Sequence, residues 1–226
     1  MMAVIHVMGL GPGTKRDLTL GVYQQIKSAH PLYVRTKQHP VVDELLAEGV
    51  AIVSFDHIYE EETDFQQVYA KIVSFLLAKA EEEGTIYYAV PGHPLVAEQT
   101  VRMLIEEGKK GRVEVRIEGG QSFLDPLFAR LQLDPNDGCL ILDGTALKVE
   151  QLNPTTHHII TQVYDRFVAS DVKLTLMELY PDEYEVVLAQ AVGVASKEVI
   201  RPLPLYELDR VVTTDNLTCV YVPPAS

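Results

Sequence analysis

The first half of the chain alternates short β-branched runs with stretches of helical periodicity. The predicted strands cover residues 4–8, 32–34, 51–55, 85–90 and 113–117. Between the first two strands, Leu18, Val22 and Ile26 recur at helical spacing, and this pattern stops at Pro31. Strands that alternate with helices form βαβ units, in which neighbouring strands run parallel. This part of the chain is therefore predicted to be an α/β fold around a mostly parallel sheet.

After Gly119 the pattern changes to shorter strands mixed with helices. The predicted strands here cover residues 139–142, 159–163, 185–189 and 218–222. The segment 201–204 contains two prolines, which favours the edge of a sheet over its centre. We therefore predict two α/β subdomains: an N-terminal one over residues 1–118 with a mostly parallel sheet, and a C-terminal one over residues 119–226 with a mixed sheet.

Composition argues against several classes of function. The 226 residues include 19 Lys and Arg against 32 Asp and Glu, a formal net charge of −13, so nucleic acid is not an expected partner. No apolar run approaches the ~18 residues of a membrane span, and residues 1–10 lack a basic leader, so we expect a cytoplasmic protein without membrane contact. Cys139 and Cys219 are expected to be reduced structural thiols, and the scattered histidines predict no metal site.

The first predicted strand runs directly into a glycine-rich loop, residues 9–14, of sequence G-L-G-P-G-T. Glycines permit positive φ and a close approach of backbone to ligand, and the helix that follows presents N–H groups to an anion. A dinucleotide fingerprint would need glycine at Thr14 and an acid near Val34, so NAD is disfavoured. The alternative is a glycine-rich turn that binds nothing.

Basic residues gather near the same predicted loop. Lys15 and Arg16 follow the first strand, and Arg35 and Lys37 follow the second. In a parallel sheet both pairs would lie at the carboxyl edge, where open α/β folds bind ligands, and there they would attract a multiply anionic substrate. A solvated rim without a partner is equally compatible with this pattern.

Two further loops follow predicted strands. In the loop 91–94, Pro94 fits the first position of a helix, which makes His93 its N-cap, an unusual residue there. In the loop 119–123, Ser122 also fits a helix cap. Loops after the first, fourth and fifth strands converge at one edge of a parallel sheet, which favours a ligand site. The alternative is that His93 and Ser122 serve only as caps.

Together these loops resemble the tetrapyrrole (corrin/porphyrin) methylase family. The resemblance rests on G-L-G-P-G-T with the L-T pair at 18–19, the G-x-P turn at 92–94 and G-Q-S-F at 120–123, and it covers essentially the whole chain. With P-G-H-P-L-V-A-E and the closing V-Y-V-P-P, the chain is most similar to bacterial N-terminal domains that precede a MazG-type nucleoside triphosphate pyrophosphohydrolase. The resemblance implies such a C-terminal domain in the full-length protein.

The resemblance also implies a function. Family members are S-adenosylmethionine (SAM)-dependent methyltransferases, usually homodimers, with the cofactor in a cleft between two α/β subdomains and no metal. By motif position, the cofactor contacts would be Pro12, Gly92, His93, Val96, Ser122, Phe123, Tyr164 and Gly193. Gly11, Gly13, Lys15, Arg16 and Arg35 would contact the substrate, a tetrapyrrole or another anionic small molecule. Methyl transfer depends on holding donor and acceptor in line, so the sequence needs no catalytic triad. The catalytic residues are therefore unknown from the sequence.

The chain departs from the family pattern at His93. Family enzymes have G-D-P where this chain has Gly92-His93-Pro94, and a cationic ring there would repel the cofactor's sulfonium. The T-x-P segment familiar in the second domain is also missing at residues 192–196. The alternative function is therefore a non-catalytic module that senses SAM or a nucleotide, or docks, for the fused pyrophosphohydrolase.

Overall fold

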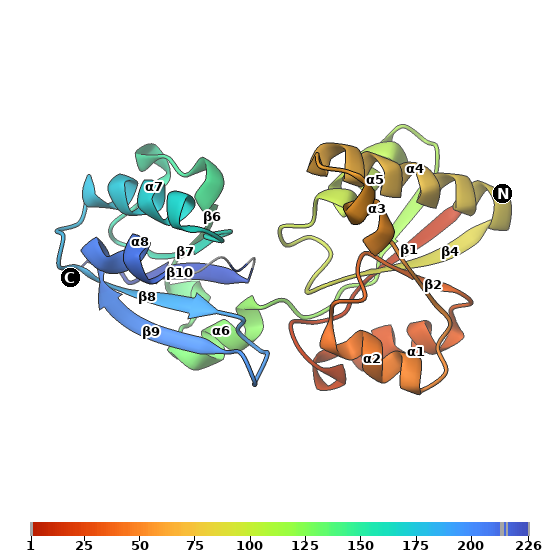
Figure 1. The fold of residues 1–226 in the computed structure, drawn as a ribbon, viewed down its shortest axis with the longest axis horizontal. Helices are drawn as coiled ribbons and strands as arrows, with labels where there is room; N and C mark the ends of the chain where they lie inside the picture. The colour runs from red at the N-terminus through yellow and green to blue at the C-terminus, as the bar shows by residue number, and fades with distance from the viewer. Residues whose placement is uncertain (1, 213–214, 216, 226) are drawn as a thin grey trace. The chain divides into compact units, whose positions relative to one another are not determined.

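The computed structural model describes residues 2–212, 215 and 217–225 (Figure 1). The chain forms two compact units, the first ending at Leu124 and the second beginning at Asp125. The loop over residues 119–123 is therefore part of the first unit. Among the described helices, none combines the length and apolar character that crossing a bilayer requires.

The first unit contains a five-stranded sheet in the order β3-β2-β4-β1-β5. These strands are β1 (Val4–Gly9), β2 (Leu32–Val34), β3 (Ile52–Ser54), β4 (Thr85–Val90) and β5 (Glu114–Ile117). All four pairings are parallel, which confirms the predicted mostly parallel sheet. The chain proceeds outward from β1 through β2 to β3, then returns to place β4 beside β1 and β5 on the other side. The connection that follows β1 leads toward one edge of the sheet, and the connection that follows β4 leads toward the other edge. Ligands of such sheets bind where the connections change direction in this way.

Helices cover both faces of this sheet (Figure 1). They are α1 (Leu20–Ser28), α2 (Pro40–Ala47), α3 (Asp56–Glu61), α4 (Phe65–Glu83) and α5 (Gln99–Lys109). Local sequence fixes the ends of α4: the Asp64 side chain accepts from the Gln66 N–H at its start, and Gly84 at φ +79° ends it. This helix thus ends where the chain turns back into the sheet as β4.

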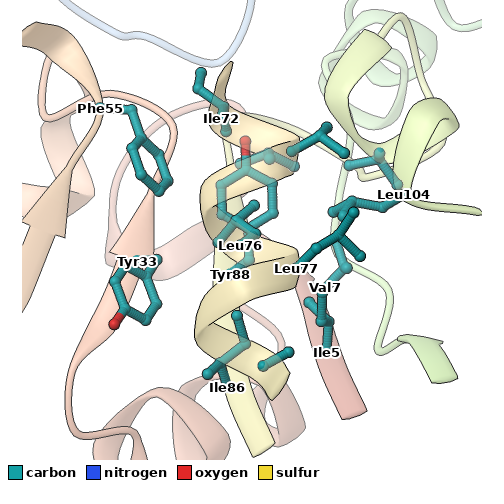
Figure 2. Packing of buried hydrophobic residues seen from close by; sticks show 14 of the residues in the cluster. Ile5, Val7, Tyr33, Phe55, Ile72, Leu76, Leu77, Ile86, Tyr88 and Leu104 are labelled. Carbon is teal, nitrogen blue, oxygen red and sulfur yellow. The ribbon is translucent and has the colours of Figure 1, made fainter. Parts of the chain in front are cut away.

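Two apolar clusters join these layers. One lies against α4 and α5, and Figure 2 shows Tyr88 within it, with Tyr33 on one side and Val7 on the other. The second cluster includes Ile26 of α1 and Leu45 of α2. Each fully buried side chain of this size contributes about 2 kcal/mol. The central strands β1, β2 and β4 are mostly apolar because both of their faces are largely buried, whereas the edge strands β3 and β5 are more exposed.

The second unit contains a five-stranded sheet in the order β6-β7-β10-β8-β9. Its strands are β6 (Cys139–Asp143), β7 (His157–Thr161), β8 (Glu185–Gln190), β9 (Val199–Pro204) and β10 (Thr218–Val222). Only β6 and β7 pair in parallel, so the sheet is mixed, as predicted, and the proline-containing β9 lies at its edge. The helices of this part of the chain are α6 (Leu124–Leu131), α7 (Arg166–Met177) and α8 (Leu208–Val211).

One predicted helix is wrong in its start. Pro94 does not open a helix: α5 begins at Gln99, with Glu98 at its N-cap position. Residues 94–97 instead form a turn that ends with Ala97 at φ +53°, a conformation that no helix continues through. The local preference of proline for a first helical position is therefore overridden by the path of this loop.

Candidate functional site

The loops after β1, β4 and β5 are joined by backbone hydrogen bonds at the carboxyl edge of the first sheet. The Gly9 N–H donates to the Gly119 carbonyl at 2.8 Å. Gly11 and Gly92 exchange two bonds, of 3.3 and 2.9 Å, and form an isolated antiparallel bridge between the first two loops. The structure thus brings together the three loops that the sequence singled out. They lie beside β1 and β4, where the connections between strands change direction across the sheet.

Glycine is required where these loops touch. A Cβ atom on Gly9 would lie 2.3 Å from the Gly92 carbonyl oxygen, and one on Gly120 would lie 2.7 Å from the Gly9 Cα. By contrast, Gly92 and Gly119 have positive φ values of +65° and +83°, and a Cβ on either would meet nothing within 4 Å. The loops are therefore closely packed at their base and open beside Gly92 and Gly119.

The predicted cofactor contacts of the first unit are all on these loops. They are the half-buried Pro12, Gly92, His93, Val96 and Phe123, and the buried Ser122. The Ser122 Oγ accepts the Leu124 N–H at 3.0 Å, as a helix cap would. Gly11 and Gly13, predicted to contact the substrate, are buried in the first loop.

His93 stabilises a turn instead of a helix. Its Nδ1 accepts the Leu95 N–H at 3.1 Å, and its carbonyl accepts the Val96 N–H at 3.0 Å. Accepting on Nδ1 requires a lone pair there, which the neutral ring with its proton on Nε2 provides. The side chain therefore has a local role that an aspartate, which also accepts from nearby N–H groups, would fill equally well.

Arg35, predicted to contact the substrate, is held in a buried polar network. Its Nη1 lies 2.9 Å from Glu98 Oε2, with side-chain exposures of 27% for Arg35 and 3% for Glu98. Glu98 also accepts from the Thr100 hydroxyl at 2.9 Å, which lies 2.9 Å from the Tyr88 hydroxyl. Burial alone would lower the pKa of Arg35, but Glu98 raises it above its ordinary value. The guanidinium is therefore charged and compensated by the protein itself.

Lys15, a second predicted substrate contact, is also paired within the first unit. Its ammonium forms an ion pair with Glu48, and the Tyr23 hydroxyl donates to the same carboxylate at 2.6 Å. The bonds from Lys15 and Tyr23 lower the pKa of Glu48 to about 2. The Lys15 N–H donates to the Glu44 carboxylate at 2.9 Å. Lys15 therefore joins the end of the glycine-rich loop to α2.

Arg16 differs from the other two bases. It is exposed, in the short 3-10 helix Lys15–Asp17, and forms no ion pair within the described residues. Of the three predicted basic contacts, its charge is therefore the one not compensated by a neighbouring carboxylate.

Sequence reasoning missed His39, which lies between β2 and α2. It is 8% exposed, its Nε2 lies 3.0 Å from the Gly11 carbonyl oxygen, and its Nδ1 accepts the Val41 N–H at 3.3 Å. The one available signal was local: Pro40 at the first position of α2 makes the residue before it the N-cap. Nothing in the sequence indicated its contact with the glycine-rich loop.

In the second unit, the structure places Tyr164 and Gly193 at the same edge of the mixed sheet. They follow β7 and β8, which both run antiparallel to β10 between them and therefore run in the same direction. The Tyr164 carbonyl accepts the Asp215 N–H at 2.9 Å, and the Gly193 N–H donates to Glu198 Oε2 at 2.9 Å.

Two strained residues also lie at this edge, and no sequence signal marked them. Gln162 directly follows β7 at φ +59°, and Ala191 directly follows β8 at φ +47°. Residues other than glycine adopt such values at a cost of about 1 kcal/mol or more, and they cluster at ligand sites. Tyr164 and Gly193 each follow one of these residues by two positions, at the same edge.

The chain is similar to known proteins over nearly its whole length. Residues 4–209 match the family model described as Tetrapyrrole (Corrin/Porphyrin) Methylases. The uncharacterized protein YabN of Bacillus subtilis (strain 168) is 49% identical over 224 residues, which cover 99% of this chain and 45% of YabN. The methyltransferase/ribosomally synthesized type I borosin cyclic peptide precursor sveMA of Serendipita vermifera subsp. bescii is 25% identical over 240 residues, covering 97% and 58%. The chain thus spans about half the length of these curated relatives.

The fold is that of a solved methyltransferase. The crystal structure of uroporphyrin-III-C-methyltransferase from Thermus thermophilus superimposes with a TM-score of 0.70, over 99% of this chain and 93% of that one. The two sequences are 19% identical, so this likeness bears on the fold alone.

Proposed function

Because the chain belongs to the tetrapyrrole (corrin/porphyrin) methylase family, we propose that it binds SAM and acts as a methyltransferase. The observation that carries this proposal is the set of three glycine-joined loops at the carboxyl edge of β1, β4 and β5. Their close packing leaves no room for side chains at Gly9 and Gly120 but leaves open space beside Gly92 and Gly119. Such an open, backbone-lined edge suits a ligand that is held largely by main-chain groups.

The residues present fit this cofactor. Pro12, His93 and Phe123 come from three different loops and would hold it in the first unit, with Val96 and Ser122 beside them. Tyr164 and Gly193 are the proposed contacts of the second unit. SAM, when bound, supplies a methyl group already activated on a sulfonium, so the protein's task is to bind and orient. The His93 ring suits a neighbouring sulfonium only in its neutral form.

The proposed methyl acceptor is a tetrapyrrole or another anionic small molecule. Arg16 supports this proposal because it is an exposed cation beside the glycine-rich loop and has no carboxylate partner among the described residues. Lys15 and Arg35 contribute less, since Glu48 and Glu98 already compensate their charges. We further propose that the protein is a cytoplasmic homodimer.

A second candidate function is favoured by His93, which stands where the family resemblance implies a carboxylate. In this alternative the chain is a non-catalytic module that senses SAM or a nucleotide, or docks, within a longer protein. The curated relative from Bacillus subtilis is about twice as long as the region it shares with this chain. A MazG-type pyrophosphohydrolase is the proposed additional domain.

Titration calorimetry with SAM and with its demethylated product tests the cofactor proposal. We expect micromolar binding of SAM at neutral pH. Binding of a nucleotide in place of SAM would favour the sensing module. The absence of SAM binding would contradict the proposed methyltransferase.

His93→Asp is expected to tighten SAM binding about tenfold, or about 1.4 kcal/mol. The carboxylate would attract the sulfonium, and it would retain the bond from the Leu95 N–H that fixes the turn. Calorimetry of the two proteins side by side measures the change in affinity. An unchanged affinity would show that residue 93 does not face the cofactor.

Arg16→Glu is expected to weaken the binding of a polycarboxylate tetrapyrrole, with uroporphyrin III as the probe, by about tenfold at low salt. The effect should shrink as ionic strength rises, because the contact is exposed to solvent. Lys109→Glu is the control: it makes the same change of charge on an exposed residue, one that is paired with Glu106, at the end of α5 that leads to the opposite edge of the sheet. If both variants lost the same affinity for the tetrapyrrole, the loss would reflect the net charge of the protein and not a contact made by Arg16.

A further inference from the structure

His39 contacts the candidate cofactor loop from outside it. It belongs to the connection between β2 and α2, where it is the N-cap of α2 and almost fully buried. Its two ring nitrogens have different partners: Nε2 lies 3.0 Å from the Gly11 carbonyl oxygen, and Nδ1 accepts the Val41 N–H at 3.3 Å. One side chain therefore caps a helix and holds the glycine-rich loop at the same time.

This pair of contacts selects one protonation state. The Gly11 carbonyl needs a donor on Nε2, and the Val41 N–H needs a lone pair on Nδ1, so only the neutral ring satisfies both. Burial lowers the pKa of His39, and it outweighs the Gly11 carbonyl and Asp17, which raise it; nearby Arg35 lowers it as well. The surroundings of the ring thus favour the same neutral form that its two hydrogen bonds require.

Gly11 is the point at which the loop after β1 is joined to the loop after β4. It exchanges two backbone hydrogen bonds with Gly92, and its φ of +74° places it in the left-handed region. A Cβ on Gly11 would lie 2.9 Å from Asp17 atoms, so the backbone here is closely confined. Because His39 bonds the Gly11 carbonyl, a change at His39 would reach the loop after β4 through the Gly11–Gly92 bridge.

We propose that His39 is a positioning residue of the cofactor site, which fixes Gly11 and thereby the relative placement of the loops after β1 and β4. This inference rests on the proposed function, since it assigns to those loops the task of holding SAM. His39 itself need not touch the cofactor. It acts through the Gly11 carbonyl, and its neutral form is the active one.

Two substitutions separate the capping role from the positioning role. His39→Asn keeps a preferred N-cap residue for α2, but its side chain is too short to reach Gly11. His39→Gln places an amide N–H near the position of Nε2 and cannot be protonated in the same pH range. We expect His39→Asn to melt within a few degrees of the wild type and to bind SAM about tenfold more weakly. His39→Gln should restore the affinity to within about threefold.

Hydrogen exchange at the Gly11 and Gly92 amides gives a readout that does not depend on SAM. These amides donate across the bridge, and they should exchange faster in His39→Asn and at the wild-type rate in His39→Gln. Wild-type SAM affinity in His39→Asn would overturn the inference. If the wild type itself bound no SAM, the proposed function would fail, and unchanged exchange in His39→Asn would then overturn the positioning role too. Should His39→Asn not fold, weak SAM binding by a folded His39→Gln would overturn it.

Discussion

Gly9→Ala is expected to destabilise the protein by about 3 kcal/mol, at the upper end of the cost of overpacking. The added Cβ would lie 2.3 Å from the Gly92 carbonyl oxygen and 3.1 Å from that of Gly119. Both atoms belong to backbone that is itself hydrogen bonded in the site, so neither can move aside cheaply. The loops would have to separate, and we therefore also expect SAM binding to be lost. Denaturant unfolding and calorimetry measure the two effects.

Gly21→Ala is the matched control for this substitution. Gly21 lies in α1, and a Cβ there would meet nothing within 4 Å. Alanine should stabilise the helix by about 0.5 kcal/mol, since glycine loses more backbone entropy on folding. A Gly9→Ala protein as stable as the Gly21→Ala protein would show that the three loops are not packed against one another as the structure has them.

Much of the first unit follows from local sequence. The segments 32–34 and 85–90 are strands with the predicted bounds, because strands buried on both faces are continuously apolar and stand out from the helices between them. The start of α5 did not follow, because the loop before it combines a local turn at His93 with a bridge to the loop after β1. Ala97 at φ +53° has no local signature, and the Gly11–Gly92 bridge that fixes the loop joins residues far apart in sequence.

The candidate site shows the same division. That the three glycine loops meet could be predicted, because the carboxyl ends of parallel strands share one edge. The ion pairs of the basic residues could not be predicted from the sequence. Lys15 pairs with Glu48 and Arg35 with Glu98, and both partners are far along the chain. Both cations were predicted as substrate contacts, and the structure gives each an internal partner. His39 was missed for the same reason, since its contact with Gly11 is a tertiary one.

Glu98→Ala is expected to cost about 3 kcal/mol of folding stability, because it leaves the largely desolvated Arg35 cation without its partner. It also removes the acceptor of the Thr100 hydroxyl, and the Arg35 Nε, already buried without a hydrogen bond, would gain nothing in exchange. Since Glu98 directly follows the loop after β4, the loop should loosen and SAM binding should weaken. Urea unfolding measures the stability and calorimetry the affinity.

The double variant Arg35→Met with Glu98→Leu shows whether the loss of stability in Glu98→Ala comes from leaving Arg35 unpaired. It removes both charges, so no unpaired charge remains. Replacing both members of a buried pair by apolar residues is often close to neutral for stability, whereas removing one member is not. We therefore expect the double variant to recover most of the loss in stability. The exposed pair Lys109–Glu106 sets the scale for a surface contact, and Lys109→Ala should change stability by no more than about 0.5 kcal/mol. A Glu98→Ala protein no less stable than Lys109→Ala would show that the pair is not desolvated. If the double variant recovers stability but not SAM affinity, the ion pair places the loop after β4 as well as stabilising the fold.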